Sequence, residues 1–408
     1  MKRVLFLVLP ALIYGDTLGS LLSLVGEDNK LAQAQGLIKS SKQKELAAQE
    51  SSYYPTVDLG AYYQSLHERS PMMPGDVYSG YAKIGFDIYD GGKRSSLVSQ
   101  KRSEFEGSGY DESELKKSLA LQVVQDFFTI KSLESTQKAR EEAGVALMSQ
   151  LDRMRAFFDA KLATIDEVDK LRAAYDTNNY NIEAIKLDIL RTKRALELKL
   201  SKKIESLEPS NFKEIRQGEM QTIDAIKSLE ASKDALKSLA ESIDSYYYPQ
   251  IRIEDTFNYY GYNNTDKAHP EGIDAQNKIM LSANFRLYDG GLLAQNKQAL
   301  ELNAKALEKQ IEYKNDEQKM LHELSIARIT TEKIKIQSAK SALHAAQSTY
   351  ETIEQKYKAG IVDNVAYLDA LASKTSAKAL YEASLNDLEI AYAFYYYYSG
   401  KNIEEFLQ

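Results

Sequence analysis

The sequence contains no cysteine and no tryptophan, and it has only seven prolines in 408 residues. Without cysteine, a disulfide framework is excluded, and so is a lipid anchor on an N-terminal cysteine. Beyond the first residues, no segment offers the 18 or so uninterrupted apolar residues that a membrane-spanning helix needs. We therefore expect any part of the mature chain that enters a membrane to do so as strands.

The N-terminus predicts a secretory signal peptide over residues 1–15. Lys2 and Arg3 precede an apolar run from Val4 to Ile13, and the small residue Gly15 follows it. This run is too short to span a bilayer, and a buried first helix is the weaker interpretation. Removing Lys2 and Arg3 takes the formal charge from −7 to −9, and such acidity argues against a nucleic-acid partner.

A duplicated motif is the strongest feature of the sequence. The tetrapeptide YDGG occurs at 89–92 and again at 288–291, so its two copies lie 199 residues apart. Ala160 and Ala359 stand in two similar segments that are also 199 residues apart. Equal offsets indicate an internal duplication.

The duplication predicts how the chain is divided. We expect a first repeat over 16–205, a linker over 206–218, a second repeat over 219–400 and a tail over 401–408. Each repeat is predicted to contain a helix, a β-hairpin, a long helix and a returning helix. The hairpins are expected at 55–89 and 249–288, where apolar and polar residues alternate with the period of a two-faced strand.

A long helix is predicted after each YDGG copy, because about 65 residues follow with helical spacing and almost no proline. At 1.5 Å per residue, each helix would be roughly 100 Å long. Gly107 and Gly109 leave open whether the first helix kinks or breaks. At the turn into the returning helix, Gly360 is predicted as a C′ residue and Asp363 as an N-cap. Thr164 and Glu167 have the spacing of a capping box at the other turn.

YDGG itself is predicted to be the junction between the last strand and the long helix. Its aspartates would cap the helix start, and its glycines would let the backbone change direction. The predicted junction residues are Asp90, Gly91, Gly92, Asp289, Gly290 and Gly291.

Four strands cannot close a membrane barrel alone, because open sheet edges are excluded from lipid and single barrels have about eight strands or more. Several chains must therefore share one barrel. The predicted fold class is α+β, mostly α, although the spacing does not give the number of chains.

The order of motifs, repeated twice and closing with AYAFYYYYSG, resembles the TolC-like outer-membrane efflux proteins of Gram-negative bacteria. The resemblance implies a homotrimer with a 12-stranded barrel in the outer-membrane lipid and a long α-helical barrel across the periplasm. It implies a passive conduit for drugs or other small molecules, docked to a periplasmic adaptor protein and an inner-membrane transporter. A channel for type I protein secretion stays open as an alternative, and a periplasmic coiled-coil scaffold or an adaptor protein is less favoured.

The resemblance also implies a gate at the periplasmic entrance. Of the two acidic positions that the family turns into the lumen, this chain has Ala366 and Asp369, so only Asp369 keeps a carboxylate. Tyr357 matches a tyrosine that the family uses to hold the entrance closed, and its expected partner is Glu167. The two helical turns are expected to dock the adaptor through Lys161, Leu162, Ala163, Gly360, Ile361 and Val362.

Enzymatic function finds no support in the sequence. The four histidines, His67, His269, His322 and His344, are scattered and lack metal-ligand spacing. There is no P-loop, nucleophile elbow or dinucleotide fingerprint. We therefore expect no catalytic residue, no metal and no cofactor.

Overall fold

The structure is a computed structural model, and it describes residues 16–26, 29–67, 75–215, 219–263 and 273–408. The predicted signal peptide and His269 lie outside these residues. The contacts divide the chain into two compact units. One contains residues 37–111 and 225–314, and the other contains residues 1–36, 112–224 and 315–408. Each unit is described by itself.

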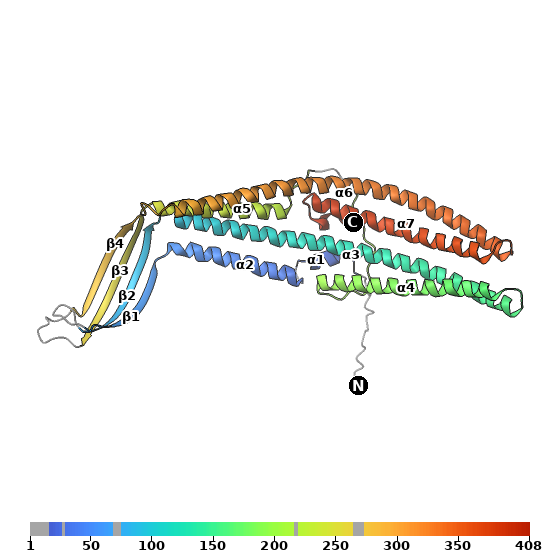
Figure 1. Ribbon diagram of the computed structural model, residues 1–408, viewed down its shortest axis with the longest axis horizontal. Helices are drawn as coiled ribbons and strands as arrows, with labels where there is room; N and C mark the ends of the chain where they lie inside the picture. The colour runs from blue at the N-terminus through green and yellow to red at the C-terminus, as the bar shows by residue number, and fades with distance from the viewer. Residues whose placement is uncertain (1–15, 27–28, 68–74, 216–218, 264–272) are drawn as a thin grey trace, which may run out of the picture. The chain divides into compact units, whose positions relative to one another are not determined.

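The first of these units contains a four-stranded antiparallel sheet in the order β1-β2-β3-β4 (Figure 1). The strands are β1 (Thr56–Ser65), β2 (Asp76–Tyr89), β3 (Gln250–Asn263) and β4 (Ala275–Asn284). The two hairpins form within the predicted ranges. In addition, β2 pairs with β3 along their length, a pairing between the two halves of the sequence that the alternation did not predict.

The sheet has one polar face and one apolar face. Cross-strand partners share a face, and the register places Lys83 beside Asp58 and Thr256 on the polar face. On the opposite face the side chains of Leu59 and Leu281 are 82% and 67% exposed. The apolar face is therefore uncovered within this unit.

Strand β4 ends at Asn284, before the end of the predicted hairpin range 249–288. The partner of Asn284 is Gln250, the first residue of β3. Beyond Asn284 the chain therefore has no backbone partner on β3, and β4 has no strand on its other side among the described residues. The alternating pattern of the sequence could not reveal the missing partner.

The two YDGG segments have the same backbone conformation. All four glycines have positive φ, with values from 66° to 88°. The Asp90 carboxylate accepts hydrogen bonds from the backbone N–H groups of Gly92 (3.1 Å) and Arg94 (2.9 Å). The Asp289 carboxylate accepts them from Gly291 (2.9 Å) and Leu293 (3.0 Å). These bonds satisfy N–H groups at the start of each long helix and lower the pKa of the Asp289 carboxyl.

The two junctions differ in how tightly they are packed, and this predicts unequal costs of mutation. A Cβ atom on Gly91 would lie 2.6 Å from the carbonyl oxygen of Ser245, whereas one on Gly290 would meet nothing within 4 Å. We expect Gly290→Ala to cost about 1–2 kcal/mol, the penalty of positive φ for an L-residue. Gly91→Ala should cost clearly more, because the backbone clash adds to that penalty. Thermal unfolding of both variants checks this, and equal losses would contradict it.

The long helices are α3 (Lys93–Asp159) and α6 (Leu292–Lys358), each of 67 residues. Helix α3 continues without a break through Gly107 and Gly109. A Cβ atom on Gly107 would lie 3.3 Å from the Cβ of Ala231 in α5 (Asp224–Asp244). Gly107 therefore allows close packing of the two helices and does not break α3.

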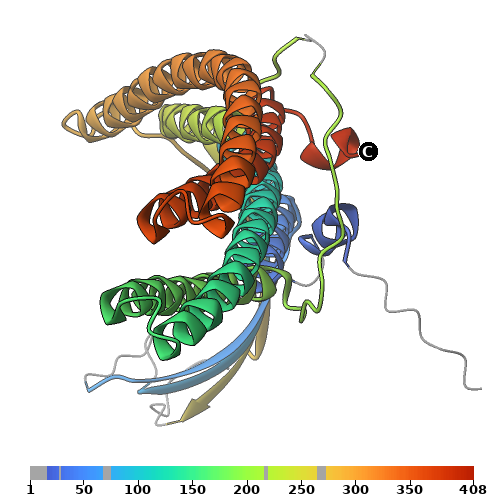
Figure 2. The ribbon, with the colours of Figure 1, turned by 90° about the vertical axis from the view of Figure 1, so that its right-hand side faces the viewer.

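The returning helices are α4 (Ile165–Leu200) and α7 (Asn364–Tyr398). In the second unit, the C-terminal part of α3 forms a helical hairpin with α4, and the C-terminal part of α6 forms another with α7. Figure 2 shows both connecting turns toward the viewer. The remaining elements are α1 (Leu18–Leu24), α2 (Lys30–Glu50), η1 (Ser51–Tyr53), η2 (Ser245–Tyr247) and η3 (Ile403–Phe406). The element order agrees with the predicted one in both halves, although the internal duplication itself stays a prediction.

The main core of the second unit includes aromatic residues from α3, from α7, from the predicted linker and from the C-terminal tail. Phe127, Tyr395 and Tyr396 are almost fully buried there. The Tyr396 ring stacks on Phe406 of the tail at 4.0 Å, and Phe212 of the predicted linker packs beside it at 6.2 Å. The linker and the tail are thus attached to the helices. Among the described residues, no helix is long and apolar enough to cross a membrane.

Candidate functional site

The two helical turns that the sequence singled out have the same hydrogen-bonded geometry. At the end of α6, Gly360 has φ 75°, and the Ile361 N–H donates to the carbonyl of Lys356 (2.9 Å). At the end of α3, Lys161 has φ 60°, and the Leu162 N–H donates to the carbonyl of Phe157 (2.8 Å). Both are Schellman turns. Lys161 therefore adopts a left-handed backbone conformation, which is usually occupied by glycine.

Side chains also cap the helices that begin after these turns. The Glu167 carboxylate accepts from the backbone N–H of Thr164 (3.0 Å) and from its hydroxyl (3.2 Å). The Asp363 carboxylate accepts from the backbone N–H of Ala366 (3.0 Å). The capping box at Thr164 and the N-cap at Asp363 are therefore present, as the sequence predicted.

The predicted adaptor-docking residues lie on these turns. The side chains of Leu162 and Ile361 are 76% and 71% exposed. Ala163 and Val362 are half-buried and pack against a shared apolar cluster of both hairpins. The turns therefore present one large apolar side chain each on a rigid base. The role of these six residues in docking stays a prediction.

The predicted link between Tyr357 and Glu167 stays a prediction, and within one copy of the chain each of the two groups has another contact. The buried Tyr357 hydroxyl has no hydrogen-bond partner among the described residues. Its ring stacks on Tyr367 at 4.9 Å with an interplanar angle of 20°. The Glu167 carboxylate is already engaged as the capping residue of α4. Both groups are thus held by contacts nearer in the sequence, which the family resemblance could not reveal.

Tyr357 belongs to a tyrosine cluster within the α6–α7 hairpin. The Tyr350 and Tyr367 hydroxyls are 3.4 Å apart, and Tyr367 is fully buried. Burial raises the pKa of Tyr350, Tyr357 and Tyr367. These hydroxyls therefore stay protonated at neutral pH, and the cluster contributes hydrogen-bonding groups without charge.

Two residues that the sequence motifs did not indicate connect the two hairpins. The side-chain amide of buried Asn364 donates to the backbone carbonyl of Glu167 (3.3 Å). The Arg153 guanidinium donates to the carbonyl of Lys358 (3.4 Å) and lies over the Phe157 ring at 5.1 Å. Glu167 thus does meet the second hairpin, but through its main chain. An asparagine following an N-cap carries no signal that would have predicted this.

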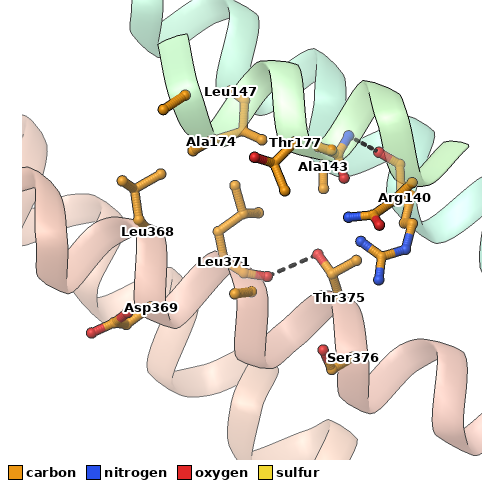
Figure 3. A pocket seen from close by; sticks show the side chains of 14 residues that line it. Arg140, Ala143, Leu147, Ala174, Thr177, Leu368, Asp369, Leu371, Thr375 and Ser376 are labelled. Carbon is orange, nitrogen blue, oxygen red and sulfur yellow. Dashed lines mark hydrogen bonds between the residues drawn. The ribbon is translucent and has the colours of Figure 1, made fainter. Parts of the chain in front are cut away.

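Asp369 borders a pocket of about 500 Å³ between α7 and the α3–α4 hairpin. Figure 3 shows Leu147, Ala174 and Leu371 gathered toward the pocket, while the Asp369 carboxylate is directed away from them. Asp369 is exposed, whereas Ala366 one turn earlier is half-buried and carries no charge. Of the two positions at which the family has acidic residues, only position 369 therefore presents an accessible carboxylate in this chain.

Glu389 is a half-buried residue whose carboxyl the sequence did not distinguish from the many solvated acidic groups. It lies on α7 and accepts a hydrogen bond from the backbone N–H of Phe212 in the linker (2.6 Å). Burial raises the pKa of Glu389 to about 7, and the Phe212 hydrogen bond acts in the opposite direction. This carboxyl therefore titrates near neutral pH.

The described residues contain no group of three or more metal-ligating side chains that could hold an ion. Burial lowers the pKa of His322, whose ring packs against Tyr395 in a tilted arrangement at 5.3 Å between centroids. This half-buried histidine therefore packs at the edge of the aromatic core.

A known protein family matches the first half of the chain. Residues 23–200 match the family described as outer membrane efflux protein. The predicted resemblance to this family is confirmed. With it, the predicted outer-membrane location, extending into the periplasm, is confirmed as well. Outer membrane efflux proteins are a family of channels and not of enzymes. A search of curated proteins found no match.

Solved structures of bacterial membrane proteins share the fold. A membrane protein from Pseudomonas aeruginosa is 14% identical, with a TM-score of 0.84, covering 95% of this chain and 91% of that one. The outer membrane protein VceC from Vibrio cholerae is 14% identical, with a TM-score of 0.81 and coverages of 95% and 96%. The CmeC outer membrane channel from Campylobacter jejuni is 14% identical, with a TM-score of 0.83 and coverages of 94% and 85%. At these identities the likeness shows the fold alone.

Proposed function

We propose that three copies of this efflux protein form the outer-membrane channel of a tripartite export system. Their sheets together form a 12-stranded barrel, and their helices form a tube across the periplasm. The channel is a passive conduit, and an inner-membrane transporter expels small molecules into it through a periplasmic adaptor. The YDGG segments are the junctions between barrel and tube.

The sheet is the single observation that carries this proposal. It is open on both sides, because β1 and β4 each pair with only one strand among the described residues. Its uncovered apolar face includes Val57 and Ile279, which are 66% and 69% exposed. An apolar face of this kind is unstable in water, and an open edge is unstable in lipid. When β4 of one copy pairs with β1 of the next inside a membrane, the apolar face meets lipid and the open edges gain backbone partners.

The entrance of the conduit is assigned to the helical turns, which also dock the adaptor. Three exposed Asp369 carboxylates, one from each copy, form a ring at this end. Rings of carboxylates attract cations in pores by ordinary electrostatics. One ring in place of two should bind cations weakly. Tyr357 and Glu167 belong to the same gate, as the residues that hold the entrance closed.

The ring predicts the outcome of one charge substitution. Asp369→Asn should lower the block of single-channel current by divalent cations, because it removes all three charges while keeping the side-chain shape. Glu382→Gln is the matched control, since Glu382 is also on α7 but lines a different groove. Planar-bilayer recordings measure both. Unchanged block in Asp369→Asn would remove this residue from the gate.

The function itself is tested in membranes. Wild-type protein should fractionate with the outer membrane, migrate as a trimer in detergent and give single-channel currents. Recovery of an elongated monomer from the soluble periplasm would overturn the proposal. A deletion strain distinguishes small-molecule efflux from type I protein secretion. If the strain becomes sensitive to drugs while its secreted proteins stay normal, the channel serves efflux. The reverse result would indicate protein secretion.

A further inference from the structure

We infer that Gly60 and Gly85 set the free width of the passage through the sheet, by letting two large side chains lie flat. The inference rests on the proposed function, in which the polar face of the sheet lines the conduit. Side chains on a strand ordinarily stand roughly perpendicular to the sheet. Tyr81 and Arg252, both on the polar face, do not.

Tyr81 lies over the backbone of its cross-strand partner Gly60. A Cβ atom on Gly60 would overlap the Tyr81 ring, so no other residue at position 60 leaves room for the ring. Tyr81 has Asn258 as its partner on the other side, and its ring is turned away from this neighbour toward β1. Tyr81 is half-buried as a result.

Arg252 lies over Gly85 in the same way. A Cβ atom on Gly85 would overlap the Arg252 guanidinium, and Gly85 is buried beneath it. The guanidinium is held flat by the carboxylates of Asp87 (2.8 Å) and Glu254 (3.2 Å). Arg252 therefore neither projects from the face nor offers an unpaired charge to a passing solute.

The glycines on the apolar face are not used in this way. A Cβ atom on Gly80 would meet nothing within 4 Å, and one on Gly261 would come only to 3.9 Å from the Cβ of Tyr78. Glycine weakens a strand interior and often marks a close approach by another group. Only Gly60 and Gly85 have such a group among the described strands, and both lie on the polar face. Aromatic cover of a strand glycine also helps to fix register, but register alone does not require a polar face.

The consequence is a smoother and wider passage than the side-chain sizes suggest. Any side chain at position 60 would raise the Tyr81 ring, and any at position 85 would raise Arg252 and free its charge. In a trimer either change is repeated three times at one level of the passage. Gly60 and Gly85 are thus specificity-determining positions for bulky solutes.

The absence of tryptophan from the chain gives a direct test of side-chain position. Tyr81→Trp introduces a single tryptophan, whose emission and quenching by aqueous iodide report exposure. Adding Gly60→Val should shift the emission to longer wavelength and increase quenching. Adding Gly80→Val, on the opposite face of the same sheet, should change neither. Gly60→Ala is the milder substitute if the valine variant does not assemble. Identical quenching in all three proteins would overturn the inference.

Solute passage tests the functional consequence separately. In proteoliposomes, Gly60→Val should reduce the uptake of large sugars more than that of small ones, whereas Gly80→Val should match the wild type. If uptake is unchanged although the tryptophan is exposed, Gly60 does not limit width. If the wild type passes no solute and gives no single-channel current, the proposed conduit fails, whatever the fluorescence shows.

Discussion

Leu281→Arg should prevent assembly of the channel in the outer membrane. Leu281 lies on the apolar face of β4, where its side chain is 67% exposed. In the proposed barrel this face meets lipid, and an arginine near the bilayer midplane costs about 2–4 kcal/mol. Three copies repeat that cost in one trimer. The expected result is loss of the protein from the outer-membrane fraction and loss of the trimer band in unheated gels.

Met280→Arg is the matched control, because it adds the same charge at the neighbouring position on the polar face. The cross-strand partner of Met280 is Glu254, so the new guanidinium would find a carboxylate and water instead of lipid. We expect this variant to assemble normally. If Leu281→Arg assembled as well as Met280→Arg, the apolar face would not face lipid, and the barrel proposal would lose its main support.

Glu389→Gln should stabilise the helical unit at pH 8 and leave its stability at pH 4 nearly unchanged. Burial raises the pKa of Glu389 in the folded state from its ordinary value of 4.5 to about 7. Between these values the folded state binds a proton that the unfolded state has already lost. The contribution of this group to the free energy of unfolding is therefore highest at low pH and falls as pH rises from about 4.5 to 7. A tenfold change in proton affinity corresponds to about 1.4 kcal/mol, so the full loss is roughly 3 kcal/mol.

Glutamine keeps an oxygen that accepts the Phe212 hydrogen bond but carries no charge. The difference in the free energy of unfolding between variant and wild type should thus grow from about pH 4.5 to 7 and then level off. The measurement is the thermal unfolding midpoint of both proteins at a series of pH values from 4 to 8. Glu382→Gln on the same helix serves as the control for the same substitution at a site that does not contact the linker. A flat difference for Glu389→Gln would mean that this carboxyl is not buried in the assembled protein.

The two local motifs show how far the sequence determines local geometry. The positive φ of all four YDGG glycines and the carboxylate caps at Asp90 and Asp289 follow from the chemistry of those residues. The capping box at Glu167 follows in the same way. Such features depend on atoms a few residues apart, so their pattern survives in the sequence. The apolar alternation likewise placed both hairpins.

Contacts between residues that lie far apart in the sequence could not be predicted from it. Nothing in the sequence indicated that β2 pairs with β3, that Asn364 meets the main chain of Glu167, or that Glu389 binds the linker. The expected contact between Tyr357 and Glu167 stays a prediction, and the contacts of these groups with Tyr367 and Thr164 were likewise not indicated by the sequence resemblance. In sequence terms Gly107 weakens a helix, whereas its neighbour Ala231, more than a hundred residues later, makes it a packing residue.

By itself the sequence determined the strands, the long helices, the turns and the family, because these depend on local periodicity and on motifs. Only the tertiary structure decided which groups are buried and which partner each one has. Tyr81 over Gly60 and Arg252 over Gly85 are examples. A strand pattern records that a residue is small or polar, but the space above a glycine is filled by a side chain from another strand, and the register of the two strands determines which one.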